Sequence, residues 1–260
     1  MTGAGSGIGK ATALLLAAEG DLVFCCDRAY TDAVSGELTA ADVHLIEGDV
    51  RETATLGRLA TLAIEQTGRI DVWVNNAGTG LVKQLEDVQE FEWDAVIDTN
   101  LKAAFFGCQQ AVRQMQKQDN GGAIVNVASN AGILPRSHDP VYSISKLSLV
   151  GLTRSLALCH SKDRIRINCV CPGPVEHTQI IEENFEGCED RDAVVKQLIQ
   201  ASPLARSWGR MIQPEEVAES IRFLCSDAAQ MISGTSVAID GGKSLGVPPA
   251  EENGAAPALP

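Results

Sequence analysis

The sequence predicts a doubly wound α/β fold in a single domain, and three observations lead to this prediction. Short β-branched runs alternate along the chain with longer segments of helical period. A glycine-rich loop directly precedes the first helical segment. The 260 residues suffice for one large core, and no proline-rich or charged linker divides them. This alternation is typical of a parallel sheet with helices on both faces.

Each expected element corresponds to a run of residues. Strands are expected at 21–26, 70–76, 122–129, 164–172 and 235–240. Helices, in which apolar residues recur at spacings of three and four, are expected near 8–20, 52–67, 91–118, 141–161 and 214–225. We expect one domain over 1–245, followed by a disordered tail over 246–260, which is rich in Pro, Ala and Gly.

The first strand of the sheet is expected to be truncated. Only Met1 and Thr2 precede the glycine loop, where this fold requires a strand. Such a strand would lie in the middle of the sheet, so we expect unpaired backbone groups on its neighbours and a smaller core there. Either the sequence is a trimmed version or the fold is compromised.

Composition limits the classes of partner and the location. Lys plus Arg number 21 and Asp plus Glu 34, and a net charge of −13 opposes binding to nucleic acid or anionic membranes. A small-molecule partner is therefore expected. No apolar run spans a bilayer and the first residues are unlike a signal peptide, which predicts a cytoplasmic protein. The eight cysteines lie mostly in apolar runs without zinc-ligand spacing, so no metal is expected.

The glycine loop predicts a site for a dinucleotide. The run TGAGSGIG places Gly3, Gly7 and Gly9 where bare backbone can turn tightly, approach a pyrophosphate and pack a helix on the sheet. The following helix N-terminus favours the negative phosphates. Alone, such a loop is weak evidence, because a simple strand-to-helix turn has the same pattern.

Asp27 predicts that the dinucleotide is NAD rather than NADP. It lies 18 residues after Gly9, where a carboxylate can accept hydrogen bonds from the ribose hydroxyls and repel an added phosphate. Ser6 is neutral and cannot attract the added phosphate of NADP. The positive Arg28, directly after Asp27, could attract it, so use of both cofactors stays open. A solvated turn residue is the alternative interpretation of Asp27.

Tyr142 and Lys146 form a candidate acid/base pair. They are four residues apart on an expected helix and therefore share one face. A phenol is a poor base at neutral pH, but a nearby ammonium and a positive nicotinamide would stabilise its phenolate. Ser129 ends a strand thirteen residues before Tyr142, at the sheet edge where such folds bind ligands. An exposed Tyr–Lys pair and a turn-forming Ser are the alternatives.

From Thr2 to Gly242 the sequence resembles the short-chain dehydrogenase/reductase (SDR) family, which has a Rossmann fold. The loop TGAGSGIG, GDV at Gly48–Val50, NNAG at Asn75–Gly78 and PGPVEHT at Pro172–Thr178 match family motifs. Asn100, Ser129, Tyr142 and Lys146 match the catalytic tetrad. Independently, Asn100 is a poor helix former inside an expected helix, which is typical of a functional site or of a capping or kink residue.

The resemblance implies a role for each matched residue. Tyr142 transfers the proton, Ser129 orients the substrate oxygen, Lys146 holds the nicotinamide ribose and lowers the pKa of Tyr142, and Asn100 holds a proton-relaying water. The implied cofactor-binding residues are Gly3, Ser6, Gly7, Ile8, Gly9, Asp27, Asp49, Val50, Asn76, Ala77, Gly78, Tyr142, Lys146, Pro172, Gly173, Val175 and Thr178. The implied reaction interconverts a secondary alcohol and a ketone, in a homotetramer or homodimer.

The segment 179–210 is expected to select the substrate, either as a lid or as two amphipathic helices on the core. Its candidate apolar contacts are Ile180, Ile181, Phe185, Leu198, Ile199 and Trp208. Its six acidic residues are Glu182, Glu183, Glu186, Glu189, Asp190 and Asp192. They either disfavour polyanionic substrates or simply form a solvated surface. A second hypothesis is a non-catalytic NAD-binding sensor or interaction subunit. A methyltransferase is disfavoured, because its chemistry does not require the Tyr–Lys pair.

Overall fold

A computed structural model describes residues 1–183, 185 and 190–246, and the expected tail from residue 247 onward lies outside these residues. Its six strands are β1 (Phe24–Asp27), β2 (His44–Glu47), β3 (Val72–Asn75), β4 (Gly122–Val127), β5 (Ile165–Pro172) and β6 (Ser236–Ile239). The strands form a parallel pair, β1–β2, and a parallel set in the order β3-β4-β5-β6. The doubly wound α/β fold is confirmed.

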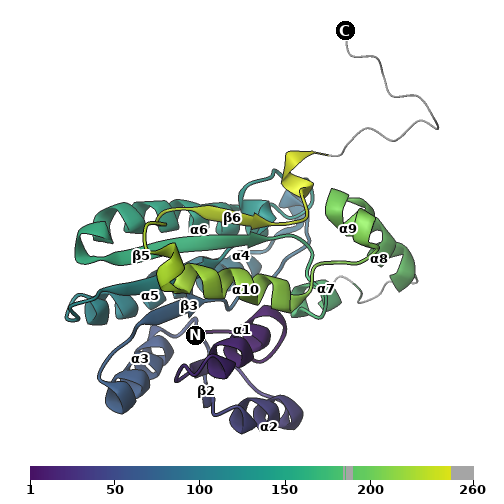
Figure 1. Cartoon of the computed structure of the whole chain (residues 1–260). Helices are drawn as coiled ribbons and strands as arrows, with labels where there is room; N and C mark the ends of the chain where they lie inside the picture. The colour runs from purple at the N-terminus through teal and green to yellow at the C-terminus, as the bar shows by residue number, and fades with distance from the viewer. Residues whose placement is uncertain (184, 186–189, 247–260) are drawn as a thin grey trace.

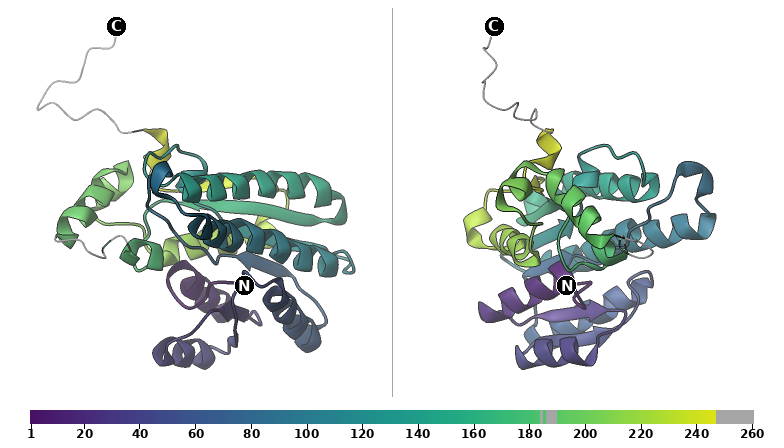
Figure 2. Two further views of the ribbon diagram at one scale, coloured as in Figure 1. Left: turned by 180° about the vertical axis from the view of Figure 1, so that it is seen from behind. Right: turned by 90° about the vertical axis from the view of Figure 1, so that its right-hand side faces the viewer.

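Helices cover both faces of the sheet (Figures 1 and 2). One face carries α1 (Gly7–Ala18) and α10 (Pro214–Cys225), which pack against each other and on alternate strand residues such as Val74 and Val125. The other face carries α3 (Thr53–Thr67), α5 (Ala103–Met115) and α6 (Pro140–His160), and includes Trp73 and Ile124. The central strands are thus buried on both faces, as in other parallel sheets.

The helical periodicity placed the five expected helices correctly, with one interruption. The expected helix 91–118 consists of α4 (Glu90–Ile97), the π-helical segment η2 (Asp98–Lys102) and α5. The sequence analysis missed α2 (Asp32–Ala40) and β2. Strand β2 is short and its side chains are only partly buried, so it lacks the apolar run on which strand prediction depends.

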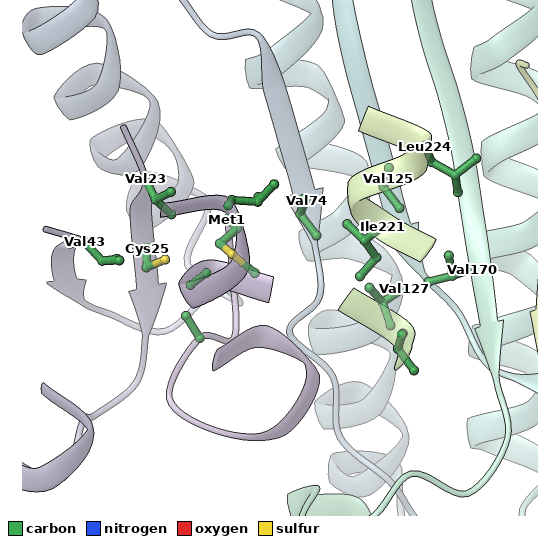
Figure 3. Packing of buried hydrophobic residues seen from close by; sticks show 14 of the residues in the cluster. Met1, Val23, Cys25, Val43, Val74, Val125, Val127, Val170, Ile221 and Leu224 are labelled. Atoms are coloured by element: carbon green, nitrogen blue, oxygen red, sulfur yellow. The ribbon is translucent and has the colours of Figure 1, made fainter. Parts of the chain in front are cut away.

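Met1 and Thr2 lie where the truncated first strand was expected, between β1 and β3. Thr2 forms isolated parallel bridges to Cys26 and Asn75, and its N–H donates to Val74 O at 3.1 Å. The Met1 ammonium donates to Phe24 O, and burial lowers its pKa below the usual value of 8.0. Figure 3 shows Met1 between Val23 and Cys25 on one side and Val74 on the other. Among the described residues, this short pairing alone joins the two parts of the sheet.

A cavity of about 310 Å³ lies beside Met1. Its lining includes Leu16 of α1, Val23 just before β1, Leu59 of α3 and Val74 of β3. Backbone groups of a parallel strand point alternately to either side. Because Val74 O faces Thr2, the N–H groups of Val72 and Val74 also face this cavity, and no described residue pairs with them. On this side of β3, the N–H groups of Val72 and Val74 therefore lack ladder partners among the described residues.

Candidate active site

A second cavity, of about 290 Å³, lies at the carboxyl ends of β1, β3, β4 and β5. Because the strands are parallel, these ends meet at one edge of the sheet, where open α/β folds bind ligands. Of the predicted catalytic and cofactor-binding residues, all line this cavity except Gly9 and Asn100. Among the described residues, no cluster of His, Cys, Asp or Glu could hold a metal ion.

The glycine loop has the shape of a phosphate cradle. Gly3 and Gly7 have φ of 71° and 47°, and a Cβ on Gly9 would lie 1.8 Å from Gly3 O. Asn76 Nδ2 holds the loop by donating to Gly3 O at 2.7 Å. The first-turn N–H groups of α1 have no intrahelical partners, and the Ser6 side chain does not cap them. The loop therefore fits a pyrophosphate group.

Asp27 is held at the end of β1, facing the loop. Its Oδ2 accepts from Gly5 N at 2.7 Å and its Oδ1 accepts from Arg28 N at 2.7 Å. A Cβ at position 5 would lie 2.9 Å from Oδ2, so a bare glycine permits this approach. The carboxylate lines the cavity with acceptor capacity left for a ribose hydroxyl.

The remaining adenosine-side residues surround Asp27. Asp49 forms an ion pair with Arg51, Nη2 to Oδ2 at 2.5 Å, and hydrogen bonding from Arg51 lowers the pKa of Asp49. The resemblance implied that the Asp49 side chain contacts adenine. Because Arg51 already binds this carboxylate, adenine and Arg51 would have to share it. Both Arg28 and Arg51 line this part of the cavity, so positive charge is present near Asp27 as well.

Thr2 organises the entrance to the site, a role that the sequence analysis missed. Its hydroxyl oxygen accepts from the N–H groups of Asn76 and Ala77, each at 3.2 Å. Neighbouring Asn75 points away into the core, where its Nδ2 donates to Asn126 Oδ1 at 2.8 Å. Thr2 thereby fixes the end of β3 against the glycine loop.

The motif Pro172–Thr178 follows β5 and lies against the glycine loop. Thr178 donates its hydroxyl to Val175 O at 2.8 Å, and its methyl group lies 2.9 Å from where a Cβ on Gly7 would be. The N–H of Gly173 donates to Ile239 O at 3.0 Å, which fixes the motif to the end of β6. The motif Pro172–Thr178 therefore forms one wall of the cavity beside the loop.

Asn100 lies in the π-helical segment that interrupts the long helix. Its Oδ1 accepts from Thr79 N at 2.8 Å, and its Nδ2 donates to Thr79 O at 2.9 Å and to Ser145 Oγ at 3.0 Å. A Cβ on Gly78 would lie 3.3 Å from Asn100 Oδ1 and 3.2 Å from Lys146 Nζ. The local irregularity expected at Asn100 is present, and π turns often occur at functional sites.

Tyr142 and Lys146 lie on one face of α6, as predicted, and both are buried. Lys146 Nζ is 5.8 Å from the centre of the Tyr142 ring and donates to Val127 O at 3.0 Å. Burial lowers the pKa of Lys146 to about 8. The structure thus brings the predicted pair together in a water-poor environment.

The expectation that Lys146, together with a positive nicotinamide, lowers the pKa of Tyr142 remains a prediction. Burial raises the pKa of Tyr142 above 10.0, while a hydrogen bond with Ser129 and the charge of Arg136 act in the opposite direction. The guanidinium of Arg136 is 5.7 Å from the centre of the Tyr142 ring. Desolvation of the phenolate outweighs these contributions, so Tyr142 is a protonated acid in this environment.

The segment 179–210 lies beside the mouth of the cavity. It forms α7 (Gln179–Glu183), α8 (Arg191–Gln200) and α9 (Pro203–Trp208), which are grouped at the right of Figure 1. Of the six apolar candidates, Ile180, Ile181 and Leu198 line the cavity, whereas Trp208 is 70% exposed. No residue of α8 or α9 is buried, so these helices are not packed in the core, and substrate selection by this segment remains a prediction. Glu186 and Glu189 lie outside the described residues.

Two further cavity residues escaped the sequence analysis. Arg136 and Lys243 line the part of the cavity that contains Tyr142. Neither belongs to a motif, and 107 positions separate them in the sequence, so only the fold brings them together.

The chain is similar to known oxidoreductases over almost its whole length. A family model described as "Enoyl-(Acyl carrier protein) reductase" matches residues 3–244. An uncharacterized oxidoreductase of Thermotoga maritima is 35% identical, covering 94% of this chain and 96% of that protein. Levodione reductase of Leifsonia aquatica is 34% identical, covering 94% and 92%.

Solved structures agree with these relatives. A crystal structure of levodione reductase superimposes with a TM-score of 0.85 at 32% identity, covering 94% of this chain and 96% of that one. The aldohexose dehydrogenase of Thermoplasma acidophilum gives a TM-score of 0.86 at 28% identity, covering 97% and 95%. The sequence motifs, the fold and these relatives together show that the chain belongs to the short-chain dehydrogenase/reductase family of NAD(P)-dependent oxidoreductases that act on CH–OH groups.

Proposed function

We propose that this enzyme interconverts a secondary alcohol and a ketone with NAD(H), using Tyr142 as the general acid and base. One observation carries the proposal: Tyr142 and Ser129 line the same cavity as the glycine loop and Asp27. One cavity can therefore hold both a dinucleotide along the glycine loop and a substrate beside Tyr142. The relatives favour this function over a non-catalytic NAD-binding subunit, because those with an assigned activity are named as reductases and dehydrogenases.

The protein's own groups have distinct tasks in this reaction. The bound dinucleotide supplies or accepts the hydride. Tyr142, held protonated by burial, donates its proton to the oxygen of a ketone and becomes a phenolate; in the reverse direction the phenolate takes the proton of an alcohol. Ser129, hydrogen-bonded with Tyr142, orients that same oxygen.

Lys146 and Asn100 support this proton transfer. Lys146 holds the nicotinamide ribose through its ammonium group, which Val127 O already orients. Asn100 fixes the backbone of Thr79 beside Lys146, and we assign it as a positioning residue for a proton-relaying water. Both residues lie beside Gly78, since a Cβ there would be 3.2 Å from Lys146 Nζ and 3.3 Å from Asn100 Oδ1.

The preference for NAD(H) rests on Asp27. Its carboxylate would repel the added phosphate of NADP, although Arg28 and Arg51 lie nearby. In thermal-shift titrations, NADH is expected to raise the unfolding temperature more than NADPH at equal concentration. Asp27→Asn keeps the side-chain shape and removes the charge, so it should increase the shift with NADPH. An equal or larger shift with NADPH for the unaltered protein would overturn the preference.

The same proposal includes one dehydrogenase domain over 1–245, a cytoplasmic location and a homotetramer or homodimer. Apolar side chains exposed on α5 and α6 support assembly: Phe105 is 44%, Ile144 45% and Leu147 59% exposed. Light scattering on the purified protein measures the assembly directly, and a monomeric mass at micromolar concentration would contradict it.

A further inference from the structure

Charge is unevenly distributed along the cavity. The carboxylates that line it, among the residues that the structure describes, are Asp27 and Asp49, and both belong to the predicted adenosine side. At the Tyr142 end the charged lining residues are Arg136, Lys146 and Lys243, all positive. A negative group of the substrate would therefore be stabilised at this end.

Arg136 has donors available for such a group. Its Nη2 is 2.9 Å from Asp139 Oδ2 and 3.2 Å from His138 Nε2. Asp139 is itself buried and accepts from Ser143 Oγ, so it anchors the guanidinium on the side of α6. The Nε and Nη1 donors of Arg136 have no hydrogen-bond partner in the described part of the chain. Each of these donors can give a charge-assisted hydrogen bond to a carboxylate oxygen.

Lys243 supplies a second positive charge near Arg136. It follows β6 in the short segment η6 (Lys243–Leu245), is half-buried and forms no ion pair with any described residue. The nearby carboxylate of Asp240 accepts instead from Gly242 N at 3.0 Å and from Ser244 N at 2.8 Å. Burial and the charge of Arg136 lower the pKa of Lys243, whereas the carboxylates of Asp240 and Asp139 act in the opposite direction. An anion bound between Arg136 and Lys243 would further offset the repulsion between these two cations.

We propose that the substrate is a small oxo acid, or the corresponding hydroxy acid, whose carboxylate binds to Arg136 and Lys243 while its reacting oxygen meets Tyr142. The distance of 5.7 Å between the guanidinium and the Tyr142 ring places the carboxylate only a few bonds from the reacting carbon, as in a 3-oxo acid. Ile181 and Leu198, which line the same cavity, would contact the alkyl chain. This inference rests on the proposed function, because it takes Tyr142 as the reacting group.

The test compares acids with their neutral esters. The probes are 3-oxobutanoate and 3-oxohexanoate, each paired with its methyl ester. Two readouts are used: NADH oxidation, and the thermal shift that each probe adds to the NADH-loaded protein. A charge-assisted contact predicts that kcat/KM for at least one acid exceeds that for its ester about tenfold or more, with a larger thermal shift.

Variants of Arg136 and Lys243 test whether these two side chains cause the preference for the acid over its ester. Lys243→Met should lower the acid-to-ester ratio of kcat/KM about tenfold, and Arg136→Gln should act in the same direction. Because loss of Arg136 leaves the buried Asp139 without its partner, Lys243→Met is the decisive variant. Lys162→Met is the matched control, since Lys162 is exposed and does not line the cavity, and it should leave the ratio unchanged.

The outcomes separate this inference from the proposed function. If NADH shifts the protein and ketones are reduced, but no acid is preferred over its ester, the carboxylate inference is overturned and the dehydrogenase function stands. The carboxylate inference is also overturned if Lys243→Met leaves the acid-to-ester ratio of kcat/KM unchanged. Failure of NADH to bind, or full activity of Tyr142→Phe, refutes the proposed function itself.

Discussion

Lys146 carries a buried positive charge, and replacing it by Met should make the protein more stable at neutral pH while removing activity. The residue is 3% exposed, and no carboxylate within the described chain forms an ion pair with it. Its ammonium has one hydrogen bond, to Val127 O. An ammonium without a counter-charge in a water-poor site opposes folding, which is why its pKa falls from 10.5 to about 8.

The size of the effect follows from this pKa difference. The drop of 10.5 − 8 = 2.5 units corresponds to about 3 kcal/mol of lost stability at pH 7, at 1.36 kcal/mol per unit. Lys146→Met keeps the length of the side chain but leaves the Val127 carbonyl without a donor, which costs about 1–3 kcal/mol. The variant should therefore be more stable than the unaltered protein by about 1 kcal/mol at pH 7.

The pH dependence of the stability difference between the two proteins is the more decisive test. Its sign follows from the direction of the pKa shift of Lys146 alone. The folded pKa of Lys146 lies below the unfolded one, so between about pH 8 and 10.5 the folded state binds fewer protons. Raising the pH through this window stabilises the unaltered protein and not the variant. The advantage of Lys146→Met should shrink by about 2.5 kcal/mol between pH 7 and pH 10, and it should then reverse.

Urea unfolding of both proteins at pH 7, 8.5 and 10 measures this difference. Lys162→Met, which removes an exposed lysine, is the control and should show no such change with pH. A stability difference between Lys146→Met and the unaltered protein that stays constant over this range would refute the reasoning, since Lys146 would then be solvated.

Two further predictions concern the loop and the central cavity of the sheet. Gly9→Ala should abolish the thermal shift with NADH, because its Cβ would lie 1.8 Å from Gly3 O, whereas Gly57→Ala, with no atom near its Cβ, should bind NADH normally. Six Val and Ile residues attached before Met1 should pair with the free N–H groups of Val72 and Val74 and raise the unfolding temperature by more than about 5 °C. A Gly–Ser extension of equal length should have no such effect, and equal results for the two extensions would show that the cavity accepts no strand.

Most of the fold was predictable because its signals are local. Strands β4 and β5 are long apolar runs, and α10 places apolar residues on one face while its first turn is polar and acidic. The predicted site residues also clustered as expected, since parallel strands bring their carboxyl ends to one edge. Strand β2 was missed because its half-buried side chains show neither alternation nor an apolar run.

The details of the site depend on contacts that the sequence does not encode locally. Thr2 looked like a loop residue, yet its hydroxyl holds the N–H groups of Asn76 and Ala77. Arg136 and Lys243 carry no motif and meet only through the fold. Burial, which the helix pattern alone does not predict, raises the pKa of Tyr142 in the protein without a cofactor.

The central claim is that Tyr142 transfers the proton in a hydride-transfer reaction. The most direct measurement compares Tyr142→Phe with the unaltered protein in NADH-dependent reduction of ketones, with NADH binding followed in parallel by thermal shift. We predict that Tyr142→Phe binds NADH with a similar shift but loses about 100-fold or more in turnover, because the phenol supplies the proton. Turnover by Tyr142→Phe equal to that of the unaltered protein would contradict the account.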